Sequence, residues 1–203
     1  MLHYETIDAR TLDLLKRLQT IPEFQNLRLV GGTALALQLG HRISVDLDLF
    51  GTVDVDVNHT LELLECFSDV QLSGSTKKMM FFNIDGVKVD IVNYPYKWID
   101  TQIEENGLRL AAINDIAAMK LAAITNRGTK KDFVDLFFLL KRYSLKELID
   151  LYTDKYPDGQ LFFVLKSLVY FEDAEEQPMP KMLADVEWSN VKKKITESVQ
   201  SLI

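Results

Sequence analysis

The segment Val30–Phe50, VGGTALALQLGHRISVDLDLF, decides the fold. A glycine pair ends an apolar run, a short segment of helical spacing follows, and two aspartates separated by one leucine come next. Alternate side chains of a strand point to the same face, so Asp46 and Asp48 are expected to share a face. Leu47 and Leu49 would then point into the core. Two carboxylates on one face of an otherwise apolar strand indicate a polar site at this edge of a sheet.

The glycine pair, Gly31 and Gly32, separates an expected strand from a helix expected to begin near Thr33. Glycine lets the backbone turn tightly and approach a ligand, and the free N–H groups of a helix start favour a phosphate. The Thr33 hydroxyl could add a hydrogen bond to that phosphate. The same residues could equally form only a tight turn and a helix N-cap. A glycine turn followed by a carboxylate pair is more specific than either half alone.

A third carboxylate, Asp90, lies in the strand-like segment VKVDIVNY, residues 87–94. If this strand neighbours the one that carries Asp46 and Asp48, three carboxylates converge. Mg²⁺ prefers oxygen ligands, and a bound cation would offset the repulsion between like charges. One D-x-D pair on a strand is also common as a solvent-facing pair, so metal binding is the hypothesis and a solvated face the alternative.

Composition limits the function classes. The chain has 203 residues and a formal net charge of −7, which argues against a broad nucleic-acid-binding surface. No apolar run approaches the ~20 residues of a membrane span, and the N-terminus lacks a signal-peptide pattern. Cys66 is the only cysteine, so no internal disulfide or cysteine-rich metal site is expected. We therefore expect a soluble, cytoplasmic protein that does not bind membranes.

The chain divides into two parts by pattern. Residues 1–96 alternate strand-like and helical segments, with a tight-hairpin signal at Asp85-Gly86. Residues 97–203 read as mainly helical, beginning with a helix for which Asn114 is the expected N-cap. The predicted fold class is α+β: a mixed β-sheet with flanking helices in residues 1–96, followed by a helical C-terminal region in residues 97–203.

A second charged cluster lies in RGTKKDFVDL, residues 127–136. Lys120 and Arg127 are about two helical turns apart and could share a face that neutralises a triphosphate. Lys131 could pair with Asp135 one turn later. A solvated, charged first turn of an amphipathic helix is the alternative.

Two further groups have a structural and a functional interpretation. His41 and Arg42 follow the helix after Gly32 and are expected to support the loop rather than take part in chemistry. Tyr94, Tyr96 and Trp98 could stack on a base, but a hydrophobic seam between the two parts of the chain is the preferred interpretation.

The quoted run resembles the signature of DNA polymerase β-type nucleotidyltransferases, in which a glycine turn precedes a D-x-D strand. It is most similar to the AbiEii/AbiGii-type toxin family, the nucleotidyltransferases of abortive-infection toxin–antitoxin systems. That family shows GGT and then H-R-x-S-x-D-L-D-x-F, which is present in residues 31–50. It also shows R-x-x-x-K-D-x-x-D, which matches residues 127–135, and an upstream lysine that matches Lys120. The resemblance covers about residues 27–140.

The resemblance implies Mg²⁺-dependent transfer of a nucleoside monophosphate from a nucleoside triphosphate to an RNA, such as a tRNA, or to a protein. It also implies a separately encoded antitoxin as a partner. The implied catalytic residues are Asp46, Asp48, Asp90, Lys131 and Asp132; the first three would also bind the metal, and Gly31, Gly32, Thr33, Lys120 and Arg127 would bind the nucleotide. Two other classes remain open: a non-catalytic nucleotide- or partner-binding relative of this fold, and a metal-dependent sugar transferase that uses D-x-D.

Overall fold

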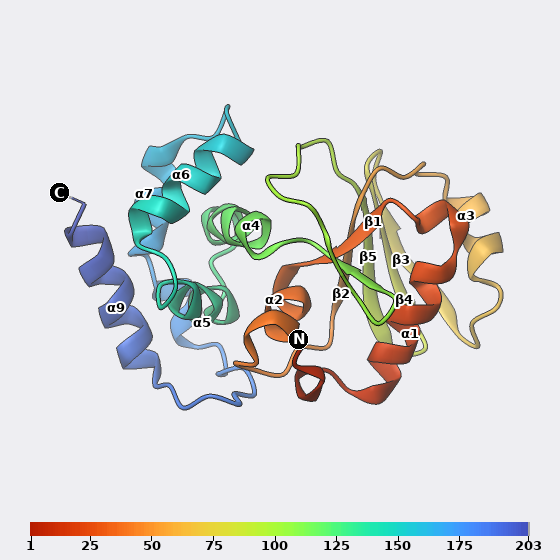
Figure 1. Cartoon of the computed structure of the whole chain (residues 1–203), viewed down its shortest axis with the longest axis horizontal. Coiled ribbons are helices and arrows are strands. Elements are labelled where there is room, and N and C mark those ends of the chain that lie inside the picture. Colours follow the sequence, from red (N-terminus) through yellow and green to blue (C-terminus); the bar gives the residue numbers. More distant parts are fainter. Residues whose placement is uncertain (203) are drawn as a thin grey trace.

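A seven-stranded mixed sheet forms the centre of the N-terminal half of the molecule (Figure 1). The computed structural model describes residues 1–202. The strands follow the order β3-β4-β5-β2-β1-β7-β6 across the sheet, and this confirms the expected α+β class. Their bounds are β1 (Leu27–Val30), β2 (Leu47–Gly51), β3 (Val70–Ser75), β4 (Met79–Ile84), β5 (Val87–Asn93), β6 (Ile103–Glu105) and β7 (Leu108–Leu110).

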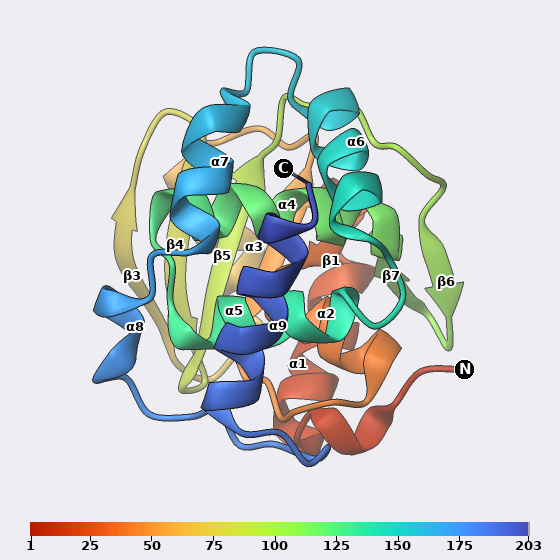
Figure 2. The same cartoon turned by 90° about the vertical axis from the view of Figure 1, so that its left-hand side faces the viewer.

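Helices cover both faces of the sheet. On one face α1 contacts β7 and α3 contacts β3, while α2 packs against β1 and β2 and then against α4 (Figure 1). The remaining helices pack outside α4 and form the C-terminal half, as Figure 2 shows from that side. The helices are α1 (Ala9–Thr20), α2 (Gly31–Leu39), α3 (Val57–Leu64), α4 (Ile113–Asn126), α5 (Lys130–Leu139), α6 (Leu145–Lys155), α7 (Leu161–Leu168), α8 (Glu172–Glu175) and α9 (Trp188–Gln200), with short 3₁₀ turns η1 (Tyr4–Thr6) and η2 (Pro22–Phe24).

The register of the central strands places the site. Strand β2 runs parallel to β5 and antiparallel to β1, and Asp48 lies opposite both Asp90 and Val30. Leu47 and Leu49 are fully buried, as the alternation in the sequence predicts, while Asp48 is only partly buried between them. The polar face of β2 therefore opens toward α2 and α4, away from the apolar layer under α1.

Local signals in the sequence account for several boundaries. Asp85 and Gly86, with φ angles of 50° and 78°, form the predicted hairpin turn between β4 and β5. Gly40, with φ of 69°, ends α2 as predicted. Asn114 is not the N-cap of α4: that position is Ala112, and the Asn114 side chain instead accepts a hydrogen bond from the Tyr143 hydroxyl.

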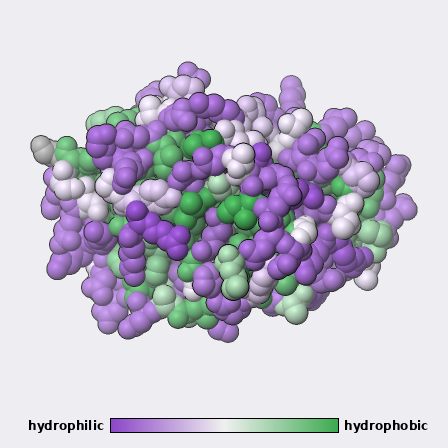
Figure 3. All heavy atoms as spheres, viewed as in Figure 1, coloured by the Kyte–Doolittle hydropathy of each residue, from purple (hydrophilic) through white to green (hydrophobic). Residues whose placement is uncertain are grey.

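The sheet continues beyond residue 96. The hairpin of β6 and β7 pairs with β1 through a parallel contact between Leu29 and Leu110, so the helical region begins at α4. The division of the chain at residue 96 stays a prediction. Within residues 1–202 no helix is long and apolar enough to span a bilayer. The face shown in Figure 3 is largely hydrophilic, with apolar atoms gathered near its middle.

Candidate active site

Three aspartates occupy backbone positions near one end of the parallel β2–β5 pair. Asp48 and Asp90 occupy directly opposed positions on the two strands. Asp46 immediately precedes β2, and both Asp46 and Asp48 line one small polar cavity. The convergence that the sequence suggested is therefore present in the backbone arrangement, although Asp46 belongs to the approach to the strand rather than to the strand itself.

The glycine pair brings the start of α2 against these carboxylates. Gly31 has a φ of 68°, a conformation that side chains disfavour, and a Cβ atom there would collide with a carboxylate oxygen of Asp48. A Cβ atom at Gly32 would likewise collide with the guanidinium group of Arg42. Helix α2 therefore begins at Gly31 rather than near Thr33, and its first N–H groups lie beside the acidic site.

Thr33 supports the loop that carries Asp46. Its side chain is buried, and its hydroxyl donates to the backbone carbonyl of Asp46 and lies 2.9 Å from the Ser44 hydroxyl. These bonds engage the hydroxyl that was expected to meet a phosphate. The phosphate contact of Thr33 stays a prediction, whereas its contact with the Asp46 loop is a feature of the fold.

Two lysines accompany the outer carboxylates. Lys131 Nζ lies 3.2 Å from Asp46 Oδ2, and Lys88 Nζ lies 2.9 Å from Asp90 Oδ2. The suggested pairing of Lys131 with Asp135 does not form. Lys88 was missed by the sequence reasoning, although its place two residues before Asp90 on the same strand puts both side chains on one face.

In the described part of the chain no lysine or arginine forms an ion pair with Asp48, and the pKa of its carboxyl group is raised. Burial, together with the nearby charge of Asp90, raises the pKa of Asp48 to about 6. Asp90 Oδ1 is buried without a hydrogen-bond partner in the described part of the chain. Both features fit a missing positive charge, and carboxylate oxygens suit Mg²⁺. Among residues 1–202, however, no three acidic, histidine or cysteine side chains are grouped as a ready metal site, because the outer carboxylates turn toward lysines.

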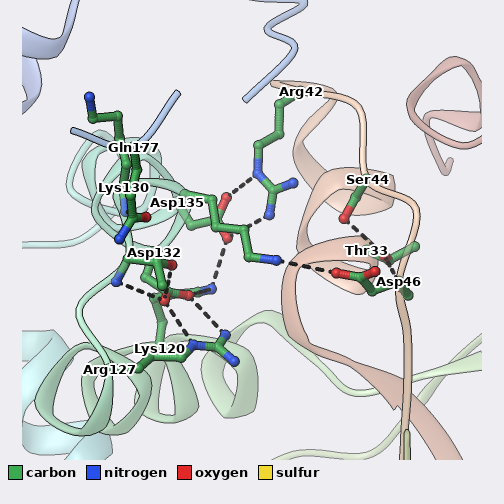
Figure 4. Close-up of polar contacts among 12 residues, drawn as sticks. Thr33, Arg42, Ser44, Asp46, Lys120, Arg127, Lys130, Asp132, Asp135 and Gln177 are labelled. Carbon is green, nitrogen blue, oxygen red and sulfur yellow. Dashed lines mark hydrogen bonds and ion pairs between the residues drawn. The ribbon is translucent and has the colours of Figure 1, made fainter. Parts of the chain in front are cut away.

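A buried charge network lies across the cavity from the carboxylates (Figure 4). Asp132, on α5, accepts from Lys120 at 2.9 Å and from Arg127 at 2.9 and 3.1 Å, and caps its own helix with Thr129. Burial alone would raise the pKa of Asp132, but Lys120 and Arg127 outweigh it and hold that pKa well below its ordinary value. Asp132 is therefore a permanent anion that fixes two cations.

Asp135 fixes the other end of the network. Arg42 donates to both of its oxygens at 2.7 and 2.9 Å, Lys120 lies 2.8 Å away, and the His41 Nε2 atom lies at 2.8 Å. Burial lowers the pKa of His41 in spite of Asp135, so the imidazole is neutral at pH 7 and donates from Nε2. The expected structural role of His41 and Arg42 agrees with these contacts. The solvated first turn considered for α5 is wrong, because Asp132 and Asp135 are fully buried.

The acidic cluster and the buried charge network line the same cavity, so the walls of this cavity carry both negative and positive side chains. Within the network, three cations pair with the two carboxylates of Asp132 and Asp135, so the network carries one net positive charge beside the acidic cluster; the cations are Arg42, Lys120 and Arg127. Lys130, next to Lys131, does not face the cavity: its ammonium donates to the carbonyl of Glu175. The polar cavity is lined by Gly32, Thr33, Arg42, Ser44, Asp46, Asp48, Lys88, Lys120, Arg127, Lys131 and Asp132. Asp46 and Asp48 thus line the same cavity as Arg42, Lys120 and Arg127.

Known proteins share this fold. JHP933 from Helicobacter pylori superposes with a TM-score of 0.58 at 20% identity, covering 97% of this chain and 93% of that one. MenT4, a nucleotidyltransferase toxin from Mycobacterium tuberculosis H37Rv, gives 0.60 at 16% identity over 93% of this chain and 81% of that one. The antibiotic-resistance factor ANT(2'')-Ia gives 0.53 at 15% identity, with 71% and 89% covered. At these identities the likeness concerns the fold.

Sequence comparison goes further. Protein aq_aa25 of Aquifex aeolicus, itself uncharacterized, is 36% identical over 185 residues, which cover 85% of this chain and 88% of the relative. The family model described as "Nucleotidyl transferase AbiEii toxin, Type IV TA system" matches residues 13–201. This match includes the glycine turn, the three aspartates and the buried charge network. The chain therefore belongs to the AbiEii family of nucleotidyl transferase toxins.

Proposed function

We propose that this protein transfers a nucleoside monophosphate from a nucleoside triphosphate to an acceptor hydroxyl in a Mg²⁺-dependent reaction. The observation that carries the proposal is the position of Asp48, opposite Asp90 and against the backbone of Gly31. An acidic pair beside a helix start can hold a cation and a phosphate next to each other.

Each side of the cavity would have its own task. Asp46, Asp48 and Asp90 would hold Mg²⁺, which when bound polarises the phosphate and neutralises its charge. Arg127 and Lys131, both exposed at the cavity, would stabilise the triphosphate and the departing pyrophosphate. Lys120, buried between Asp132 and Asp135, would keep α4 and α5 in place behind them.

The bond changes follow from this arrangement. The acceptor oxygen forms a bond to the α-phosphorus while the bond from that phosphorus to the β-phosphate oxygen breaks, and pyrophosphate leaves. Asp90 would help to activate the acceptor hydroxyl by taking its proton. Positioning and charge neutralisation supply the remaining catalysis.

The family context extends the proposal to a biological role. We infer that the protein acts in the cytoplasm, that it is toxic on its own, and that a separately encoded antitoxin restrains it. The acceptor would be an RNA, such as the end of a tRNA, or a protein hydroxyl.

One observation favours a second candidate, a nucleotide-binding relative without turnover. Lys88 and Lys131 already neutralise the two outer carboxylates, so the site can exist without a metal. Thermal shift with Mg²⁺ and each nucleoside triphosphate, combined with detection of pyrophosphate release, separates the two. Transfer predicts Mg²⁺-dependent stabilisation and pyrophosphate in the presence of an acceptor. Stabilisation without pyrophosphate under every acceptor condition would favour the second candidate.

A further inference from the structure

Two tyrosines from the segment after β5 and two from α6 and its C-cap line a chamber beside the site. Tyr94, Tyr96, Tyr152 and Tyr156 line it together with Asn126 and Gly159, and it has a volume of about 320 Å³. Four aromatic rings around one opening go beyond the hydrophobic seam that the sequence suggested.

Most of this wall is held rigidly. The hydroxyls of Tyr94 and Tyr156 are hydrogen-bonded at 2.7 Å, and Tyr94 packs on Trp98 with ring centroids 5.3 Å apart. Beneath them the ammonium group of Lys155 lies 5.1 Å from the Tyr94 ring and pairs with Asp115 at 2.6 Å. These contacts are the seam. They leave the Tyr94 and Tyr156 rings fixed as a wall.

Tyr96 lies at the exposed edge of this cluster, with its ring centroid 5.3 Å from that of Tyr94. Its side chain is 45% exposed, and its ring meets Tyr156 edge-on at a centroid distance of 4.8 Å. On the opposite side the turn between α6 and α7 comes close, because Gly159 has no side chain: a Cβ atom there would lie 2.6 Å from the Tyr152 hydroxyl. Gly159 thus lets this turn pack against Tyr152 at the border of the chamber, which the exposed Tyr96 ring also lines.

The chamber continues into the active site. It shares Tyr94, Asn126 and Tyr156 with a cavity of about 340 Å³ that reaches Gly31, Asp48 and Arg127. A cavity of this size can hold one small-molecule ligand by itself. The tyrosine chamber is therefore additional space. It is lined by tyrosine rings, by the exposed amide of Asn126 and by the exposed carboxylate of Asp158.

We propose that the tyrosine chamber is a nucleobase subsite in which a base stacks on Tyr96 and is read by the amide of Asn126. The inference rests on the proposed function, since the adjoining carboxylates would place the reacting phosphate. Aromatic rings stack on bases of any sequence, and an amide can donate to and accept from a base edge. The base belongs either to the acceptor or to the incoming nucleotide.

The test measures equilibrium binding to the full chain by two probes. Calorimetry measures the binding of ATP, GTP, CTP and UTP, each in the presence of Mg²⁺. Fluorescence anisotropy measures the binding of a fluorescein-labelled single-stranded RNA hexamer of mixed sequence. Tyr96→Leu removes the ring, Tyr96→Phe keeps the stacking face, and Phe162→Leu on α7 is the control, a ring 71% exposed that lines neither cavity.

Tyr96→Leu is expected to weaken one probe by about 5-fold or more, while Tyr96→Phe and Phe162→Leu stay within about twofold of the wild type. Weakened RNA binding assigns the base to the acceptor, and weakened triphosphate binding assigns it to the incoming nucleotide. If the wild type binds a probe and Tyr96→Leu changes neither, the subsite is refuted and the proposed function stands. If the wild type binds no triphosphate in Mg²⁺, the proposed function fails and the subsite fails with it.

Discussion

At the scale of single residues, Asp48 differs from the other two aspartates of the site, because no lysine or arginine forms an ion pair with it in the described part of the chain. Lysines accompany Asp46 and Asp90, whereas burial and Asp90 raise the pKa of Asp48 to about 6 from an ordinary 3.8. The folded protein then binds more protons than the unfolded chain between these pH values. The free energy of unfolding therefore falls as pH rises through this window and becomes level above it.

Replacement of Asp48 by asparagine removes this cost. In EDTA at pH 8 the Asp48→Asn variant is expected to exceed the wild type in free energy of unfolding by about 2–3 kcal/mol, and at pH 3, below both pKa values, the two should coincide. Urea denaturation at the two pH values measures the difference. An equal difference at both would show that the effect is not the charge of Asp48.

Gly31 combines two demands on one residue, and the chain provides a control for one of them. Gly31 and Gly107 both have positive φ angles, 68° and 78°, but only at Gly31 would a Cβ atom meet another group, the Asp48 carboxylate. Gly107→Ala is expected to cost about 1–2 kcal/mol through the backbone alone. Gly31→Ala should cost more and should also weaken Mg²⁺ binding. Equal losses of stability in urea, with Mg²⁺ affinity unchanged, would contradict the close approach.

At the scale of elements, the middle of α5 is joined to two other segments of the chain. Asp135 meets Arg42 from the loop after α2 and Lys120 from α4, all of them buried. This network holds the helical wall of the cavity opposite the carboxylates.

Breaking a buried charge network by removal of its anion leaves unpaired cations. Asp135→Ala is therefore expected to lower the free energy of unfolding by about 3–5 kcal/mol. Asp150→Ala, which removes a solvent-exposed pair with Lys146 on α6, should behave as the wild type. Chemical denaturation of the two variants compares them. A small, equal effect would mean that the network does not hold α5 in place.

Local chemistry is what the sequence allows one to predict at this scale. Alternation placed Leu47 and Leu49 in the core, and Asp85-Gly86 located the hairpin. The partners of charged side chains could not be predicted, because they depend on segments far apart in the chain. Lys131 meets Asp46, 85 residues away, and Asp135 meets Arg42, 93 residues away. Distant partners also explain why Asp132 and Asp135 of α5 are buried, although the local sequence is typical of a solvated helix turn.

At the scale of the whole molecule, both halves of the chain line the cavity. Asp46, Asp48 and Lys88 come from the sheet half, and Lys120, Arg127 and Asp132 come from the helical half. In the sequence the two motifs lie on either side of the change from strands to helices, and the cavity brings both together. The sequence suggested that the strands of Asp48 and Asp90 are neighbours, but it could not predict the register that places the two residues opposite each other. Parallel strands are joined by a long crossover, which local sequence signals do not determine.

Membership of a toxin family leads to a cellular prediction. Expression of the wild-type chain without its antitoxin is expected to stop growth, and the Asp46→Ala/Asp48→Ala double variant should be harmless at the same protein level. Colony counts after induction, with immunoblots to match the amounts, provide the measurement. Normal growth with a wild-type protein that is active in vitro would contradict the toxin role.

The most direct measurement is label transfer in vitro. The protein is incubated with Mg²⁺, each α-labelled nucleoside triphosphate, and either total cellular RNA or total protein. We predict that the wild type attaches label to one of these acceptors and releases pyrophosphate, that EDTA abolishes both, and that Asp150→Ala retains both. The Asp46→Ala/Asp48→Ala double variant should transfer none. Undiminished transfer by that variant would contradict the assignment of the carboxylates as the catalytic centre.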